Sequence, residues 1–290
     1  MITVGLDGTD HSLAAVDWAA REATRRGDTL RLVHARIWRR ADNVMILADE
    51  DAERRWAEEV LSEGAARVAR SYPELTVSTE VLADDPVPGL VAEAEAADLL
   101  VLGSRGFGTL TGYLIGSIST HVLRQTNRPV VMVRPPRAGD AERPQDEVVV
   151  GVPEEEDTAR AVLEYAFASA AASGASVRAV RAWGTPVVLA WGVEMALAAD
   201  TARGLEATNR DLLATAVRPF LDRYPDVKVL DRVELGSPAE VLLEQCERAS
   251  LVVVGRHAKL GPSPRRIGSV AHAVLHHAPA PVAVIPPPAS

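Results

Sequence analysis

The feature that most constrains this chain of 290 residues is an internal repeat with one fixed spacing. Three pairs of residues are each separated by 152 positions: Gly103 with Gly255, Gly116 with Gly268, and Pro129 with Pro281. One register shared by three pairs indicates a duplicated unit rather than chance similarity. The sequence therefore predicts two copies of one fold in tandem.

Each copy alternates short apolar runs with helical patterns. In the first copy the apolar runs are 2–6, 30–37, 75–82, 99–102 and 129–133, and helical periodicity occupies 13–26, 52–71, 86–97 and 116–125. Parallel strands need a crossover between them, which is usually a helix, so this alternation is typical of a doubly wound α/β sheet. The second copy repeats the pattern from residue 148 onward.

The segment 134–147 separates the two copies. It is rich in proline and polar residues and has no hydrophobic period, which is typical of a linker. We therefore place the first domain at residues 1–136, the linker at 137–147 and the second domain at 148–287.

The candidate binding element is a glycine-containing loop in the first copy. It begins at Gly103 to Gly106, after the apolar run 99–102, and ends at Gly116 to Ser119, where a helix is predicted to start. Amides in the first turn of a helix have no partner within the helix and attract anions. Glycines accept positive φ and let a ligand approach the backbone, and serine hydroxyls can cap the helix or donate to the ligand. The arrangement predicts a phosphate site.

The spacing of this loop, G-x-x-G followed after nine residues by G-S, resembles the nucleotide loop of the universal stress protein family, in its ATP-binding branch. The resemblance covers both copies and is strongest over 2–8 and 99–119. It implies two Rossmann-like domains of the adenine nucleotide alpha hydrolase type, each a five-stranded parallel sheet with helices on both faces. It also implies ATP in the first domain, with Mg²⁺ held by the phosphates. The implied binding residues are Gly5, Leu6, Asp7, Ala35, Leu102, Gly103, Arg105, Gly106, Gly116, Ser117, Ile118 and Ser119.

Three of these residues have a second interpretation that the sequence leaves open. Asp7 ends the first predicted strand, where open α/β sheets bind ligands, but aspartate also commonly starts a turn. The resemblance places Ala35 against the base, and the second interpretation is a core alanine. Arg105 can donate two hydrogen bonds to a phosphate or lie exposed on the surface.

The nucleotide motif is degenerate in the second copy. Pro153 stands where the first copy has Asp7, and it offers neither a carboxylate nor an N–H. Ala258 stands where the first copy has Gly106, although Gly268 and the serine after it remain. We interpret this copy as a site kept for packing, and a residual anion site or a site for another ligand stays open.

Charge and motif content argue against several other functions. The net charge of −9 does not suit nucleic acid or an anionic membrane. The first copy contains no lysine, which a P-loop requires, and residues 5–9 lack the G-x-G-x-x-G of a dehydrogenase. The histidines have no Cys or carboxylate partners at ligand spacing, so we expect no metal site. With no Ser-His-Asp elbow motif, we assign no catalytic residue.

Two further features concern the compartment. Cys246 is the chain's single cysteine, so no intrachain disulfide can form, and its apolar helical pattern predicts a buried small hydrophobe. No basic segment precedes the first strand, and the apolar stretch 186–199 is too short to span a bilayer. These patterns predict a cytoplasmic protein.

Three hypotheses for function follow. In the first, ATP orders the glycine loop and the irregular segment 38–51, and so changes the surface that an unidentified protein partner contacts, as expected of a nucleotide-responsive stress or signalling protein. In the second, the same site supports a slow ATPase or phosphotransferase, for which only Asp7 or Asp10 offers a general base. In the third, the protein is an interaction module that binds no nucleotide.

The last predicted strand of each copy, 129–133 and 281–285, is a sheet edge that would promote aggregation if it were left uncovered. The resemblance implies that such edges pair. We therefore expect the two domains to pair within the chain, and a further pairing of two chains into a dimer stays open.

Overall fold

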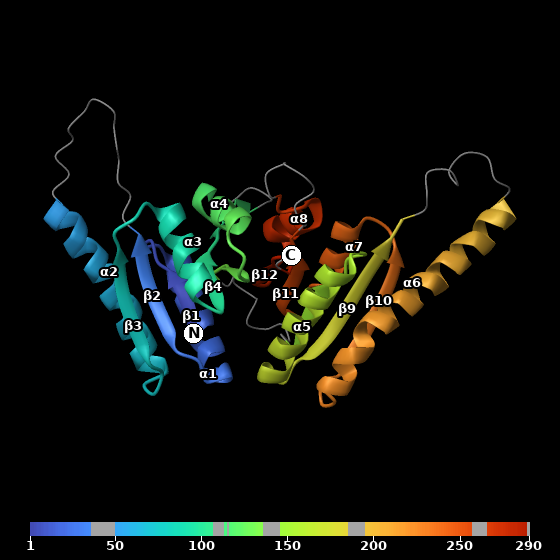
Figure 1. Ribbon diagram of the computed structural model, residues 1–290, viewed down its shortest axis with the longest axis horizontal. Helices are drawn as coiled ribbons and strands as arrows, with labels where there is room; N and C mark the ends of the chain where they lie inside the picture. The colour runs from blue at the N-terminus through green and yellow to red at the C-terminus, as the bar shows by residue number, and fades with distance from the viewer. Residues whose placement is uncertain are drawn as a thin grey trace, which may run out of the picture. The chain divides into compact units, whose positions relative to one another are not determined.

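The computed structural model describes residues 1–35, 50–106, 113–114, 116–135, 146–184, 195–256 and 266–288. The chain divides into two compact units, Met1–Ala138 and Gly139–Ser290 (Figure 1). This division falls inside the segment predicted as a linker, of which residues 136–145 lie outside the described part of the chain.

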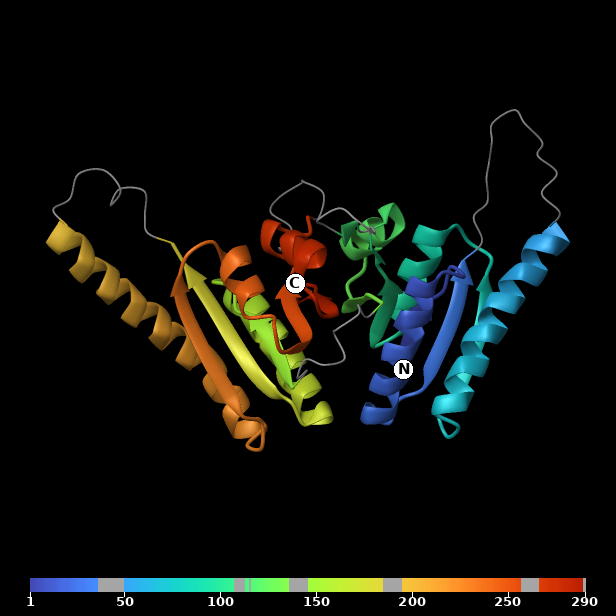
Figure 2. The ribbon, with the colours of Figure 1, turned by 180° about the vertical axis from the view of Figure 1, so that it is seen from behind.

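Among the described residues, the first unit forms a parallel sheet of five strands in the order β3-β2-β1-β4-β7. The strands are β1 (Ile2–Gly5), β2 (Leu30–Ala35), β3 (Val77–Leu82), β4 (Leu99–Gly103) and β7 (Val130–Val133). The helices are α1 (Asp10–Arg26), α2 (Glu50–Ser71), α3 (Pro86–Ala96) and α4 (Ser117–Gln125). Helix α1 packs beside α2 and α3 beside α4, so the two pairs cover opposite faces of the sheet (Figure 1, Figure 2). The predicted doubly wound α/β class is confirmed.

Helix α1 begins at Asp10, three residues before the start predicted from its apolar period. The side chain of Thr9 accepts a hydrogen bond from the amide of Ser12, which satisfies one amide of the first turn. At the other end Gly27 adopts φ +67°, which glycine tolerates without strain, and the helix stops there as predicted. Periodicity missed the first turn because a polar cap, and not an apolar face, sets where this helix starts.

Helix α2 begins at Glu50, so it includes Glu50 and Asp51, which were predicted to be irregular. The rest of that predicted segment, up to residue 49, lies outside the described residues.

The central strands of the first unit are buried on both faces. Val4 of β1 and Leu100 of β4 are fully buried, as are Ala15 and Ala19 of α1. Strands covered on both faces appear in a sequence as continuous apolar runs, which is why β1 and β4 were predicted correctly. The alanines of α1 keep its axis close to the sheet.

Among the described residues, the second unit repeats this arrangement with the strand order β10-β9-β8-β11-β12, also parallel. The strands are β8 (Glu147–Gly151), β9 (Ser176–Trp183), β10 (Val229–Leu235), β11 (Ala249–Gly255) and β12 (Val282–Ile285). The helices are α5 (Glu156–Ser173), α6 (Met195–Arg223), α7 (Pro238–Glu244) and α8 (Ser269–His277). The order corresponds strand for strand to that of the first unit.

Two elements of the second unit begin differently from what their sequence suggests. Glu147, the last residue of the segment predicted as a linker, is the first residue of β8, where it pairs with Ser176 of β9 and Ala249 of β11. Its buried carboxylate also pairs with Nε of Arg178 at 2.6 Å. Ser237 precedes α7 but makes no side-chain cap. Instead α7 starts at Pro238, whose fixed φ suits the first turn of a helix.

Candidate functional site

A cavity of about 380 Å³ lies at the carboxyl ends of β1, β2 and β4 in the first unit. Open α/β sheets bind ligands at this edge, beside the strand where the order of connection reverses. The volume is in the range of small-molecule sites. The predicted site residues that line it are Gly5, Leu6, Asp7, Ala35, Leu102, Gly103, Gly116, Ser117, Ile118 and Ser119.

The first turn of α4 forms one end of this cavity. Gly116 is the N-cap and has no side chain that could bond to the first-turn amides, and this turn contains no acidic residue. The amides and the positive end of the helix dipole therefore suit an anion. Gly116 has φ −59°, and a Cβ on it would meet no atom of the described residues within 4 Å. Within the described part of the chain, neither backbone conformation nor packing requires glycine here, whereas a ligand that approaches the backbone closely would require it.

Gly103 lines the cavity, but packing alone is enough to require glycine there. A Cβ on Gly103 would lie 2.6 Å from the carbonyl carbon and oxygen of His11 and 2.8 Å from the amide nitrogen of Ser12. The positive φ expected of the loop glycines is found at neither Gly103 nor Gly116. That expectation was wrong because it is the close contact of α1 with the end of β4 that excludes a side chain at Gly103.

The carboxylate of Asp7 is held in the turn between β1 and α1. Its Oδ1 accepts hydrogen bonds from the hydroxyl of Thr9 at 2.6 Å and from the amide of Thr9 at 3.1 Å. Asp7 therefore shapes the turn, as its second interpretation proposed, and it also lines the cavity as an exposed residue. The two roles are compatible because a carboxylate has about four acceptor positions.

His34 precedes the predicted Ala35 and is a buried residue of the cavity wall, 6% exposed. Its Nδ1 lies 2.8 Å from the carbonyl oxygen of Leu6, which only accepts, so Nδ1 carries the proton. Burial lowers the pKa of His34 below its ordinary value, so the ring is neutral at pH 7 and its Nε2 is an acceptor. The rings of His34 and Trp56 meet edge to face with centroids 5.0 Å apart.

Sequence reasoning missed several wall residues, because α1, α2 and α3 bring them from distant positions. Glu53 and Trp56 come from α2, Leu90 from α3, and His11 from α1. Nδ1 of His11 is buried and has no hydrogen-bond partner among the described residues, which costs about 1–3 kcal/mol until a ligand or water satisfies it. The one sequence signal for His11 was its place four residues after Asp7.

Arg105 and Gly106 form β5 (Arg105–Gly106), which pairs antiparallel with β6 (Tyr113–Leu114). The residues between these two short strands lie outside the described part of the chain. The predicted contacts of Arg105 and Gly106 with phosphate stay predictions.

The corresponding place in the second unit has different side chains. Pro153 follows β8 as Asp7 follows β1, and Arg181 of β9 occupies the register position of His34 in β2. Arg181 is 7% exposed; its Nη1 donates to the carbonyl of Pro153 at 3.2 Å and its Nε donates to Oδ1 of Asn209 at 2.9 Å. A buried arginine thus joins the end of β8 to α6 where the first unit has a cavity wall.

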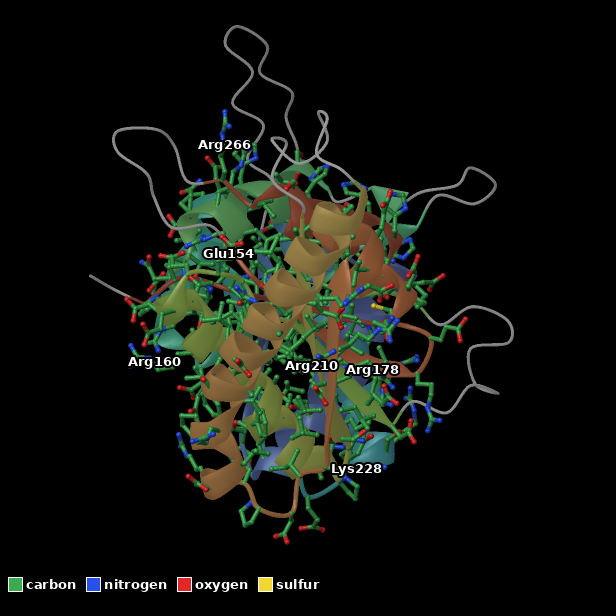
Figure 3. All side chains as sticks on the ribbon, turned by 90° about the vertical axis from the view of Figure 1, so that its right-hand side faces the viewer. Glu154, Arg160, Arg178, Arg210, Lys228 and Arg266 are labelled. Carbon is green, nitrogen blue, oxygen red and sulfur yellow. The ribbon has the colours of Figure 1, made fainter. Side chains whose placement is uncertain are left out.

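The residues that follow β4 and β11 also differ between the two units. Arg256 follows β11 as Ser104 follows β4, and both residues are buried. Figure 3 shows Glu154, in the turn after β8, and Arg266 toward the carboxyl ends of the strands, whereas Lys228 lies at the opposite end of the unit. Ala258 lies outside the described residues, so the degenerate motif as a whole stays a prediction.

Other candidate chemistry is limited. Within the described ranges, no three His, Cys, Asp or Glu side chains lie close enough together to hold a metal ion. Cys246 is buried, as predicted, and burial raises the pKa of its thiol to about 12, so it is a poor nucleophile. None of the helices in the described part of the chain has the length and apolar character needed to cross a membrane.

Known proteins match this chain over nearly its whole length. The sequence profile of the Universal stress protein family matches residues 1–134 and 146–286. A universal stress protein of Mycolicibacterium smegmatis is 32% identical over 300 residues, covering 99% of this chain and 97% of the relative. Another, from Mycobacterium tuberculosis, is 32% identical over 306 residues, covering 98% and 94%. The crystal structure of a universal stress protein from Archaeoglobus fulgidus has a TM-score of 0.71 at 19% identity, covering 99% and 98%.

Proposed function

The chain belongs to the universal stress protein family, and we propose that its first unit binds ATP in the cavity at the ends of β1, β2 and β4. One observation carries the proposal: the cavity joins an uncapped helix start at Gly116, a carboxylate at Asp7 and an apolar wall that includes Leu90. Phosphates, ribose hydroxyls and a flat base are the parts of an adenine nucleotide that match these three features.

Each part of the ligand has a partner of suitable chemistry. The amides of the α4 first turn and the hydroxyls of Ser117 and Ser119 would donate to phosphate oxygens. The carboxylate of Asp7 would accept from a ribose hydroxyl, and Leu6 and Ala35 would contact the base. Mg²⁺ would be held by the phosphates, since the described residues supply no ligand cluster for it.

In this proposal ATP acts as an effector and not as a substrate. Elements far apart in the chain, among them α2 and α4, contribute to one cavity, so a ligand that contacts both favours the conformation in which they lie together. Binding of ATP would increase the population of this conformation and so change the surface that a partner contacts. This behaviour is expected of a nucleotide-responsive stress or signalling protein. A cytoplasmic location and pairing through the β7 and β12 edges, within or between chains, stay predictions.

The first experiment is to denature freshly purified protein and to measure the released nucleotide per chain by chromatography. We expect about one ATP per chain, because the second unit lacks the counterpart of Asp7. Two nucleotides per chain would show that the second unit also binds. No nucleotide, together with no heat on titration with ATP and Mg²⁺, would favour an interaction module. Steady formation of ADP would favour the slow ATPase.

The second experiment tests the assigned residues by calorimetry. Replacing Asp7→Ala together with Gly116→Val removes the ribose acceptor and places a side chain at the helix start. We expect ATP affinity to fall about 100-fold, which corresponds to about 2.7 kcal/mol. The matched control is Glu154→Ala, which removes a carboxylate from the equivalent turn of the second unit and should leave affinity unchanged. Unchanged ATP affinity in the double variant would show that the site assignment is wrong.

A further inference from the structure

We propose that α2 supplies the base-recognition wall of the site, where Trp56 stacks on the base while Glu53 and His34 select a base with an exocyclic amino group. The inference rests on the proposed nucleotide function, and it names the side chains that set the specificity of that same cavity.

The two helix starts at the cavity differ in charge, and this difference orients the ligand. The first turn of α4 has no acidic residue, whereas α2 begins with acidic residues that include Asp51 and Glu53, and Glu53 lines the cavity. A phosphate is repelled by these carboxylates and attracted to α4. The base therefore lies on the side of β2 and α2.

Trp56 is placed to stack on that base. Its side chain lies three residues after Glu53 on α2, so both are on one side of the helix, and both line the cavity. The indole is held by Gly8, where an added Cβ would come within 2.9 Å of Cζ2, and by the edge-to-face contact with His34. Trp56 nevertheless stays 50% exposed. A ring fixed by two neighbours and still half exposed at a cavity wall is a preformed stacking surface.

Two side chains on this side of the cavity, His34 and Glu53, offer hydrogen-bond acceptors. Nδ1–H of His34 is engaged by the carbonyl of Leu6, which leaves Nε2 as the acceptor of the ring, and the ionised carboxylate of Glu53 only accepts. Such a wall favours a base that donates. Adenine carries an amino donor at C6 and an acceptor at N1, whereas hypoxanthine carries a carbonyl acceptor at C6 and a donor at N1. In this proposal the acceptors of the wall face C6, so they should distinguish ATP from ITP.

The test is calorimetric titration of the full chain with ATP and with ITP, both with Mg²⁺. Wild type should bind ATP about 10-fold more tightly than ITP, because ITP presents an oxygen to acceptors. Glu53→Gln, whose amide also donates, should reduce this preference to within about two-fold. Trp56→Leu should weaken both nucleotides about 10-fold through lost stacking. Matched controls are Glu59→Gln, exposed on α2 and away from the cavity wall, and Trp18→Leu on α1, which should bind like wild type.

The outcomes separate the two proposals. If wild type binds ATP but Trp56→Leu binds it equally well, or if the preference over ITP is missing or survives Glu53→Gln, this inference is overturned while the proposed function stands. If wild type binds neither nucleotide, the proposed function fails and this inference fails with it. Circular dichroism of each variant checks that the fold is retained, which is expected because Glu53 and Trp56 lie outside the core.

Discussion

The first and second units order their strands in the same way, but the residues that follow equivalent strands differ in kind. After the first strand of each unit stands Asp7 in one and Pro153 in the other. On the neighbouring strand, His34 lines a cavity whereas Arg181 donates hydrogen bonds across the corresponding place to Pro153 and Asn209. The sheet depends on apolar runs that both units keep, and the chemistry at its edge depends on a few single positions.

Glycines occupy equivalent positions in the two units, but different physical factors act on them. Gly103 and Gly255 are both required by packing, since an added Cβ would lie 2.6 Å from the backbone of α1 in one unit and 2.5 Å from Thr158 of α5 in the other. Gly116 and Gly268 differ, with φ −59° and φ +91°. Identical residues at equivalent positions of a motif therefore do not imply an identical role. Three comparisons between equivalent positions of the two units test how far the units differ.

The largest effect is expected at the close-packed glycines. Gly103→Ala should destabilise the first unit by about 3 kcal/mol or more, because the obstructing atoms belong to the backbone of α1 and can move little. Gly255→Ala should cost about 1–2 kcal/mol, because its obstruction is Cγ2 of Thr158. Urea denaturation measures both values.

A double variant tests whether Thr158 is the obstruction at Gly255. Thr158→Ser removes Cγ2 and should recover most of the stability lost in Gly255→Ala, while Thr158→Ser alone serves as the control. Equal losses at both glycines, or no recovery in the double variant, would contradict the distinction between a backbone and a side-chain obstruction.

A smaller effect is expected at the second glycine pair. Gly268→Ala should cost about 1–3 kcal/mol, since φ +91° with ψ 152° is a region that only glycine occupies without strain. Gly116→Ala should change the free energy of unfolding by less than about 0.5 kcal/mol, since its φ suits any residue and no described residue lies within 4 Å of an added Cβ. Thermal unfolding of the two variants is the measurement. A large loss at Gly116 would mean that structure alone requires that glycine.

The smallest effect concerns pH and distinguishes His34 from Arg181. Burial lowers the pKa of His34, so below its ordinary value near 6.5 the unfolded chain binds a proton that the folded chain does not. The contribution of His34 to stability is therefore lost as the pH falls from about 6.5 toward its folded pKa. His34→Gln should flatten the fall in unfolding free energy over this window, as measured by urea titrations at several pH values.

Arg181→Gln is the matched control for this prediction, because it removes the buried side chain at the equivalent register position and leaves His34 in place. It should lower stability by a constant amount without changing the slope against pH. The same slope in wild type and His34→Gln would show that His34 does not couple folding to protonation.

Much of the fold could be predicted from the sequence because its causes are local or periodic. The buried runs of β1 and β4, the helix stop at Gly27 and the fixed spacing of the repeat are visible without coordinates. Features that depend on polar partners were less visible. The start of α1 at Asp10 depends on the cap from Thr9, and Glu147 begins β8 with a buried carboxylate paired to Arg178, which no hydrophobic pattern reveals.

The residues of the candidate site also fall into those that the sequence predicted and those that it missed. Asp7 was predictable because it follows the first strand, and Gly116 because a helix was predicted to start there; the resemblance placed Ala35 beside them. Glu53, Trp56 and His11 were not, because each belongs to a helix whose contact with the cavity depends on how that helix packs on the sheet. Spacing along the chain contains no information about which face of a helix meets a cavity.

The duplication, the α/β class and the family could be predicted from the sequence, because spacing, apolar runs and turn residues act over short stretches of chain. Coordinates were needed to show that packing requires Gly103, that His34 is buried and neutral, and that α2 contributes Trp56 to the cavity wall. Those properties arise when backbone and side chains from distant segments exclude water and contact one another. Close contact with α1 explains Gly103, and burial beside Leu6 and Trp56 explains His34.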